Sequence, residues 1–387
     1  MSDSRASVQV VADLERLVCD LVAIESVNPE LVADGSGESN IARFVATWLQ
    51  EQGLQVSIVE PVKGRPSVVG VLRGSGGGSS LMLNAHMDTV GAGGMERAFE
   101  PVVREGRVYG RGAYDMKASL AAIMLTAREA TKLRLKGDLI ITAVSDEEVA
   151  SLGTSSVLEQ FRADAAIVTE PTELRLCLAH KGFVWLEVKT EGVAAHGSRA
   201  DLGVDAIVRM GRILTGVANL DRRLRAGRGH RLLGRGSVHA SLIDGGQEWS
   251  TYPAQCRLKV ERRTIPGEDA ARALGELEAL IAIAREEDPR FEASARVVLE
   301  RAPSEMSAAS PLGTAVARAA KEALGQDPDA VGVAYWMDMA LTNAAGIPTV
   351  AFGPSGEGEH ADVEWVDLAS VGRCVEVYLR SAELLCS

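Results

Sequence analysis

The sequence has few aromatic residues, few cysteines and no long apolar run, and each shortage excludes a class of protein. Phe, Trp and Tyr make up 4% of the 387 residues, so aliphatic side chains must fill the core. The five cysteines are scattered without a C-x-x-C pair, which argues against a disulfide framework or a thiolate zinc site and favours a reducing compartment. No apolar run reaches the roughly 18 residues that a membrane span needs. The polar start MSDSRASVQV lacks a signal-peptide core, so we expect a cytoplasmic protein.

The sequence also has fewer basic than acidic residues. The chain has 41 Lys and Arg against 53 Asp and Glu, a formal net charge of -12. This balance argues against nucleic acids and anionic membranes as partners. The length is sufficient for two domains with a sizeable core, and the 46% hydrophobic and 24% charged residues are ordinary for a globular protein.

Predicted helices and strands alternate over the first part of the chain. Apolar residues at helical spacing predict helices over residues 8–24 and 38–54. The runs SVVGVL, LMLNA, DLIITAV and DAAIVT predict short buried strands between further helices. This alternation is typical of a mostly parallel sheet with helices on both faces. The segment GSGGGSS lies between two strands and lacks the Lys-Ser/Thr of a phosphate loop, so we expect a flexible turn there.

The pattern changes near residue 180. The predicted order over the next stretch of about 115 residues is β-α-β-β-α-β, which is the ferredoxin-like unit. The α/β alternation then resumes. We therefore predict a first domain from residues 1–180 and 296–387, interrupted by an inserted α+β domain over residues 181–295.

Histidines and carboxylates fall where several predicted strands end. A histidine ends the strand LMLNAH, a pair of glutamates follows DLIITAV, and another glutamate follows DAAIVT. An aspartate precedes the helix that starts near Lys117, and a further histidine lies in the loop GPSGEGEHADVEW. Open α/β sheets bind ligands at the carboxyl ends of their strands, so we expect these side chains to meet at one edge. They are His86, Asp115, Glu147, Glu148, Glu170 and His360.

Two histidines and several carboxylates suit Zn²⁺, Co²⁺ or Mn²⁺. Four groups could hold one ion, and five with a bridging carboxylate fit two ions roughly 3.5–4 Å apart. Asp88 could accept the second ring N–H of His86, and a free glutamate of the Glu147–Glu148 pair could be a general base. Each residue alone has an ordinary explanation, such as a solvated helix start for the glutamate pair. Their convergence favours the metal site.

Seven segments resemble the M20 metallopeptidases in their order and spacing. This family includes acetylornithine deacetylase, succinyl-diaminopimelate desuccinylase, aminoacylase and glutamate carboxypeptidase. The resemblance covers nearly the whole chain. It implies a di-zinc aminopeptidase-like catalytic domain with a mixed sheet, plus an inserted ferredoxin-like lid and dimerisation domain. The segments are LNAHMDTV, YGRGAYDMKASLAA, AVSDEEVASLGT, VTEPTE, GVAAHGSRADLGVDAI, ERRTIPGE and EHADVEW.

The resemblance also implies which residues hold the two metal ions of each chain. His86 and Glu170 would complete one site. Glu148 and His360 would complete the other. Asp115 would bridge both ions. Zinc is the expected metal, with cobalt or manganese as alternatives.

Further roles come from the same resemblance. Glu147 would be the general base, and Asp88 would be the partner of the His86 ring. His196, in AAHGS, would be a lid histidine that reaches across a homodimer to the substrate carbonyl oxygen. Arg263, in RRTIPGE, resembles an arginine that meets a substrate carboxylate, although the adjacent Arg262 leaves two candidates.

These observations predict a metal-dependent hydrolase that cleaves the amide bond of an N-acyl amino acid or small peptide. The segment LAHKG resembles the acetylornithine deacetylase branch more than the desuccinylase branch. The alternatives are a dipeptidase or carboxypeptidase, a single-metal enzyme, and a non-catalytic metal-binding relative of the same fold. The complete ligand set together with Glu147 favours an enzyme over a degenerate relative.

Overall fold

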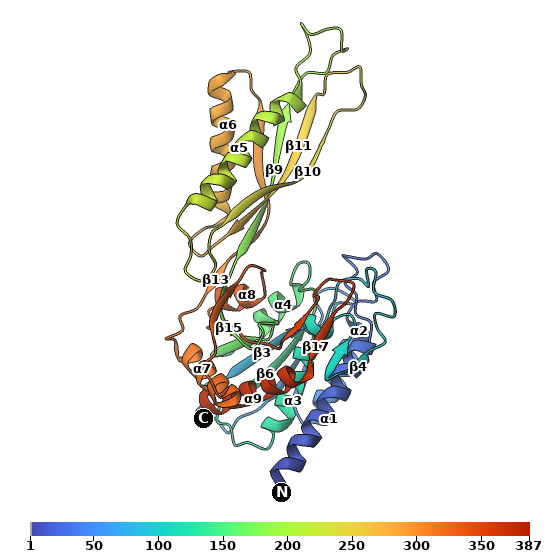
Figure 1. Ribbon diagram of the computed structural model, residues 1–387, viewed down its shortest axis with the longest axis vertical. Helices are drawn as coiled ribbons and strands as arrows, with labels where there is room; N and C mark the ends of the chain where they lie inside the picture. Colours follow the sequence, from blue (N-terminus) through green and yellow to red (C-terminus); the bar gives the residue numbers. More distant parts are fainter. Residues whose placement is uncertain (1) are drawn as a thin grey trace. The chain divides into compact units, whose positions relative to one another are not determined.

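The computed structural model describes residues 2–387, with side chains from residue 12 onward. The chain divides into two compact units (Figure 1). The first comprises Met1–Leu178, Met306–Val331 and Met337–Ser387, and the second comprises Ala179–Glu305 with Gly332–Trp336.

A mixed sheet forms the centre of the first unit, in the strand order β1-β2-β6-β3-β7-β15-β8, and β14 (Ala330–Val333) also pairs with β8. The neighbours β6, β3, β7 and β15 are parallel, whereas the pairs β1–β2, β2–β6 and β15–β8 are antiparallel. This confirms the predicted α/β fold with a mixed sheet. The strands are β1 (Gln55–Val59), β2 (Ser67–Leu72), β3 (Leu81–His86), β6 (Leu139–Val144), β7 (Ala165–Val168), β8 (Leu176–His180) and β15 (Thr349–Ala351).

Helices cover both faces of this sheet. On one face, α3 (Ala118–Ala130) packs against β3 and against α9 (Leu368–Leu385). Most of the α3 side chains are buried, because its sequence ASLAAIMLTAREA is apolar around nearly the whole circumference. Also in contact with these helices are α1 (Ser2–Ala23), α2 (Ser39–Glu51) and α7 (Pro311–Leu324). On the other face lie α4 (Leu152–Gln160) and α8 (Met339–Ala344).

A small antiparallel sheet, in the order β16-β17-β5-β4, joins two distant parts of the sequence in the first unit. Its central pair aligns Val366 with Val108, and Tyr109 lies beside Trp365. This sheet fixes the loop that contains His360, because that loop connects β16 to β17. The strands are β4 (Val102–Arg104), β5 (Arg107–Tyr109), β16 (Gly356–Glu357) and β17 (Trp365–Asp367).

The second unit has the predicted order β-α-β-β-α-β, arranged as an antiparallel sheet in the order β10-β11-β9-β12. Both helices pack on it through apolar residues at helical spacing, such as Met210, Ile213 and Val217. The sheet continues to the end of β12, beyond the boundary expected at residue 295. The elements are β9 (Gly182–Glu191), α5 (Ala206–Ala226), β10 (Ser237–Gly245), β11 (Gln255–Thr264), α6 (Ala270–Glu287) and β12 (Ala293–Arg301).

Two expectations concern the whole chain. All five cysteines are free thiols. Among the described residues, no helix combines the length and apolarity needed to cross a bilayer.

Candidate metal centre

The first unit brings together the six side chains that the sequence predicts to meet at one edge of the sheet, namely His86, Asp115, Glu147, Glu148, Glu170 and His360. His86 is the last residue of β3, and the glutamates follow β6 and β7, the parallel neighbours of β3. Carboxyl ends of parallel neighbours share one edge of a sheet. Asp115 lies in the short turn η1 (Ala113–Lys117) just before α3, where its own backbone is not helical, and His360 lies between β16 and β17.

Asp115 lies between the two histidines. Its Oδ1 is 3.0 Å from Nε2 of His86, and its Oδ2 is 3.3 Å from Nε2 of His360. His360 Nε2 is also 3.1 Å from Oε2 of Glu148, and His86 Nε2 is 3.7 Å from Oε1 of Glu170. The geometry is therefore that of two histidine–carboxylate groups joined by one aspartate, with each aspartate oxygen facing a different group.

The two members of the glutamate pair face different partners. Ligand atoms of His86, Asp115 and Glu148 all lie within 4.8 Å of one another, and so do those of His86, Glu147 and Glu170. Glu148 alone of the pair contacts His360. The Glu147 carboxylate makes no hydrogen bond within residues 12–387, although its backbone is anchored.

Burial of this many carboxylates strongly shifts their protonation. Burial raises the pKa of Glu147 and of Glu170 well above the usual range, and neighbouring negative charges add to the effect. Hydrogen bonds with Asp115 and Glu148 raise the pKa of His360 to about 10. Burial opposes protonation of His86, but Asp115 and the other carboxylates outweigh it and raise the pKa of that ring. If all its carboxylates were ionised, the cluster would hold more negative charge than its two imidazoles can balance, and a bound cation would relieve that imbalance.

Asp88 positions both ends of this cluster. Nδ1 of His86 lies 2.9 Å from the backbone carbonyl of Asp88 and 3.7 Å from its carboxylate. The ring N–H therefore donates to the carbonyl, whereas the sequence pointed to the carboxylate. The carboxylate instead accepts hydrogen bonds from the backbone N–H groups of Glu147 at 3.0 Å and Glu148 at 3.2 Å, and from the Asn28 side chain at 2.8 Å.

Comparison with known proteins identifies the family. The model of peptidase family M20/M25/M40 matches residues 82–384. This chain belongs to that family. It is 31% identical over 331 residues to an acetylornithine deacetylase from Myxococcus xanthus, covering 83% of this chain and 84% of that protein. It is 28% identical over 261 residues to an N-formyl-4-amino-5-aminomethyl-2-methylpyrimidine deformylase from Bacillus subtilis (strain 168), covering 62% of this chain and 61% of the relative.

Solved structures with low sequence identity share the fold of this M20 family member. Aminopeptidase PepT from Bacillus cereus ATCC 10987 aligns with a TM-score of 0.81 at 17% identity, covering 97% of this chain and 99% of that one. A dinuclear metal-binding peptidase of the M20 family from Bacillus subtilis aligns with a TM-score of 0.75 at 18% identity, covering 98% and 99%. The family membership makes this protein a metallohydrolase that acts on amide or peptide bonds.

His196 and Arg263 belong to the second unit of the M20 chain. His196 is exposed in the loop between β9 and α5. The backbone N–H of Ser198 donates to Nδ1 of His196 at 3.2 Å, and the Ser198 hydroxyl lies 2.8 Å from the same nitrogen. Since Nδ1 accepts, the ring proton of the neutral imidazole is on Nε2.

The two neighbouring arginines of β11 have different surroundings. Arg262 is 1% exposed and pairs with Glu268 and Glu276, each at 2.9 Å. Arg263 is partly exposed, and its Nε donates to Glu261 at 2.7 Å. Both terminal nitrogens of Arg263 make no hydrogen bond within the part of the chain that the structure describes. Arg262 thus serves the interior of the second unit, and Arg263 presents an open guanidinium fork.

Glu364 anchors the segment that carries Asp115, a role that no pattern in the sequence predicts. Its Oε1 accepts from the backbone N–H groups of Tyr114 at 2.9 Å and Asp115 at 3.0 Å. Its Oε2 accepts from Gly112 at 3.0 Å and from Nη1 of Arg111 at 2.7 Å. This buried carboxylate therefore has all its acceptor positions filled by one turn of backbone and one guanidinium.

Asp338 is a second buried carboxylate that the sequence analysis does not single out. Burial raises its pKa to about 6, and the Thr154 hydroxyl donates to it. Its charge contributes to the raised pKa values of Glu147 and Glu170. Asp338, the residue before α8, thus adds to the negative potential of the site when it is ionised.

We predict that Glu364→Gln destabilises the first unit. An amide puts an NH₂ group against backbone or guanidinium N–H groups and leaves buried donors unpaired, which costs about 3 kcal/mol. The measurement is urea unfolding of the chelated, metal-free protein. Glu357→Gln, an exposed change in the adjacent strand, is the matched control. Equal midpoints for the two variants would contradict the anchoring role.

Proposed function

We propose that this M20 enzyme hydrolyses the amide bond of an N-acyl amino acid, or of a small peptide, with two divalent metal ions. The observation that carries this proposal is Asp115, whose two oxygens face two separate histidine–carboxylate groups. The acetylornithine deacetylase and the deformylase relatives favour a deacylase over a peptidase.

The donor set fits two such ions. His86 with Glu170 would hold one, and His360 with Glu148 would hold the other, with Asp115 shared. The donors are imidazole and carboxylate with no thiolate, and the excess of buried carboxylates favours divalent cations. We expect zinc, with cobalt or manganese as alternatives. Bound metal ions would lower the pKa of a water molecule and polarise the substrate carbonyl.

Glu147 is our candidate general base. Its side chain lies beside the His86–Glu170 group, while Glu148 contacts His360. The hydrogen bond from the Glu147 backbone N–H to Asp88 fixes the backbone position of Glu147. Within residues 12–387, the Glu147 carboxylate accepts no hydrogen bond from another protein group. It would take the proton of the attacking water and return it to the leaving amine.

We expect Glu147→Gln and Glu148→Gln to fail in different ways. Loss of the base lowers kcat by about 10²–10⁴-fold and leaves the metal content near that of the wild type. Loss of a ligand lowers the metal content itself. The measurements are amine release from N-acyl amino acids and elemental analysis per chain. The assignment within the pair is wrong if the two variants lose the same amount of metal, and the metal requirement is wrong if chelated protein keeps full activity.

Arg263 is our candidate for binding the substrate carboxylate. Its guanidinium has both terminal nitrogens open, and a planar fork suits bidentate carboxylate binding. Arg262 is unsuitable, because its guanidinium is buried against two glutamates.

We predict that Arg263→Gln lowers kcat/KM for an N-acyl amino acid by about 10–100-fold and has little effect on its methyl ester. Arg262→Gln, the matched neighbour, should lower the melting temperature without changing the ratio of acid to ester cleavage. Steady-state kinetics with both substrates, and thermal unfolding, provide the measurements. An unchanged acid-to-ester ratio in Arg263→Gln would assign the carboxylate to another group.

We further propose a homodimer formed through the second unit. β10 is an edge strand, and it exposes Leu242 and Ile243. Trp249, in the loop after β10, is fully exposed at 106%. Exposed apolar side chains on an unpaired edge are typical of an interface. His196 forms a backbone bridge with Thr251, so a partner that covers this edge would approach His196.

In this arrangement His196 would act on the substrate of the partner subunit. Its Nε2–H is a donor suited to a carbonyl oxygen on which charge develops. A two-fold axis would make the arrangement reciprocal. The free thiols agree with the reducing, cytoplasmic compartment that the sequence predicts.

A subunit-mixing experiment tests the proposal. Inactive His196→Ala and inactive Glu147→Gln proteins are exchanged into mixed dimers. If His196 acts across the interface, one site of each mixed dimer combines the intact Glu147 of one subunit with the intact His196 of the other. We therefore expect activity to reappear. Exchange verified by mass spectrometry without any activity would show that His196 does not act across the interface.

A further inference from the structure

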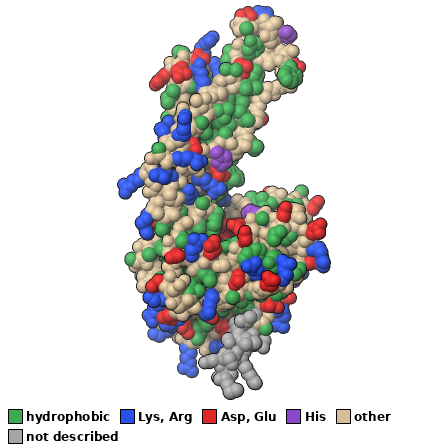
Figure 2. Space-filling model, in the orientation of Figure 1, with side chains coloured by type: hydrophobic (Ala, Val, Ile, Leu, Met, Phe, Trp, Pro, Cys, Tyr) green, Lys and Arg blue, Asp and Glu red, His purple; other side chains and the backbone are tan. Residues whose placement is uncertain are grey.

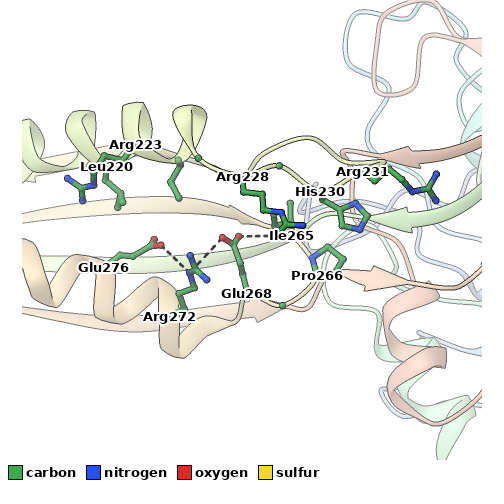
Figure 3. Close-up of a pocket in the computed structure, with 15 residues that line it drawn as sticks. Leu220, Arg223, Arg228, His230, Arg231, Ile265, Pro266, Glu268, Arg272 and Glu276 are labelled. Atoms are coloured by element: carbon green, nitrogen blue, oxygen red, sulfur yellow. Dashed lines mark hydrogen bonds and ion pairs between the residues drawn. The ribbon is translucent and has the colours of Figure 1, made fainter.

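Lys and Arg side chains are spread over the surface of the second unit, and contacts rather than charge distinguish Arg263 among them (Figure 2). At the end of α5 and in the loop that follows, Arg223, Arg228 and Arg231 line a cavity of about 710 Å³. Figure 3 shows these three side chains pointing apart, so they present no common binding edge. The contacts of Arg263 are of a different kind.

The alternation of β9 decides which side chains share a face of the sheet with Arg263. The even-numbered residues of β9 pack into the core with α5 and α6, so its odd-numbered residues, Phe183 and Trp185 among them, point to the other face. In the register of β9 and β11, Phe183 lies opposite Arg263, and Trp185 lies opposite Glu261. Directly opposite residues share a face, so these four side chains lie together.

Four contacts join these side chains into a closed group, the Arg263 cluster (Phe183, Trp185, Glu261 and Arg263). Nε of Arg263 donates to Oε1 of Glu261 at 2.7 Å, and Nε1 of Trp185 donates to Oε2 of the same carboxylate at 2.9 Å. The centroids of the Trp185 and Phe183 rings are 5.4 Å apart, and Cζ of Arg263 lies 5.2 Å from the centroid of the Phe183 ring. Each side chain thus contacts two others, which restricts the rotation of every member.

The cluster leaves one edge of the Arg263 guanidinium open. Glu261 occupies Nε, so a second carboxylate cannot pair with the side of the guanidinium that contains Nε. The two terminal nitrogens remain, and neither makes a hydrogen bond within residues 12–387. A carboxylate can therefore bind in the plane of the guanidinium only end-on, through these two nitrogens.

Another arginine on the same face lacks this support. Arg296 of β12 pairs with Glu187 of β9 at 3.0 Å, and the two residues are directly opposite each other. The Arg296 side chain is 65% exposed, against 33% for Arg263, and no aromatic ring stacks on it within the described residues. A cross-strand ion pair therefore forms on this face without an aromatic neighbour. The aromatic rings and the indole donor are additional features at Arg263.

We propose that Glu261, Trp185 and Phe183 position the Arg263 guanidinium so that its two terminal nitrogens bind the substrate carboxylate end-on. This inference rests on the proposed role of Arg263 and adds residues that act only through it. A guanidinium that is already held loses less side-chain freedom when the substrate binds. The cluster therefore favours substrates with a free carboxylate without contacting them itself.

Two substitutions that leave the charge unchanged test the cluster. Trp185→Phe removes the indole N–H that holds Glu261 but keeps a ring against Phe183, and Phe183→Leu removes the ring beside Arg263. For the N-acetyl amino acid that the wild type cleaves fastest, we expect kcat/KM to fall by about 3–10-fold in Trp185→Phe. We expect a fall of about 2–5-fold in Phe183→Leu. Cleavage of the corresponding methyl ester should change by less than about twofold, because the ester lacks the carboxylate.

Trp336→Phe is the matched control in the second unit. The Trp336 indole N–H donates to the backbone carbonyl of Ala302 at 3.1 Å, and Cζ of Arg301 lies 5.5 Å from the centroid of the indole ring. Trp336 makes no hydrogen bond or ring contact with the Arg263 cluster within the described residues. We expect the acid-to-ester ratio of this variant to equal that of the wild type. Thermal unfolding verifies that all the variants fold.

A double-mutant cycle separates positioning from a general structural effect. In the Arg263→Gln background, Trp185→Phe and Phe183→Leu should change the acid-to-ester ratio by less than about twofold, because the group that they position is absent. Equal effects with and without Arg263, an unchanged ratio in both single variants, or the same change in Trp336→Phe would overturn the positioning inference and leave the role of Arg263 intact. An unchanged ratio in Arg263→Gln itself would reject the substrate role of Arg263, and this inference with it.

Discussion

The carboxylate of Asp88 is the acceptor on which the metal centre depends. It takes the backbone N–H groups of Glu147 and Glu148, so it sets where both glutamate side chains begin. The carbonyl of the same residue takes the ring N–H of His86 and turns Nε2 toward Asp115. Asp88, in the loop after β3, therefore orients His86 at the end of β3 and the two glutamates that follow the neighbouring strand β6.

Behind Asp88, a buried polar chain continues away from the site. Asn28 donates to Asp88 and, at 3.0 Å, to Asp146. Arg65 then pairs with Asp146 at 2.8 Å and with Glu38 at 2.7 Å. Each carboxylate in this chain has a donor, which is the condition for burying charge without a large cost. At the candidate metal centre, the Glu147 and Glu170 carboxylates have no such donor within residues 12–387, so a bound cation would stabilise their charge.

The sequence predicts the candidate metal ligands better than the residues that support them. His86, Glu148 and Glu170 could be found because they follow buried strands, and strand ends of a parallel sheet share an edge. The supporting role of Glu364 could not be predicted in this way. Its partner Arg111 lies far away in the sequence, and no hydrophobic pattern links the two positions.

The same reasoning applies to the fold. The main sheet follows from hydrophobic runs and strand–helix alternation. The small sheet that fixes the His360 loop does not, since its strands have two or three residues, too few to show a period. The end of the insertion lies beyond the expected residue 295, because β12 continues to Arg301 and the second unit extends to Glu305.

The strand order of the first unit has a consequence for its synthesis. β15 lies between β7 and β8, yet it is synthesised only after the strands of the inserted unit. Until residue 351 emerges, the edge of β7 has no neighbour on that side, and the histidine and glutamate of the final loop do not yet exist. The ferredoxin-like sheet, which lies between β8 and β15 in the sequence, ends at Arg301, so it can form before β15 joins the main sheet. The candidate metal centre can therefore assemble only after the segments on both sides of the inserted unit have been made.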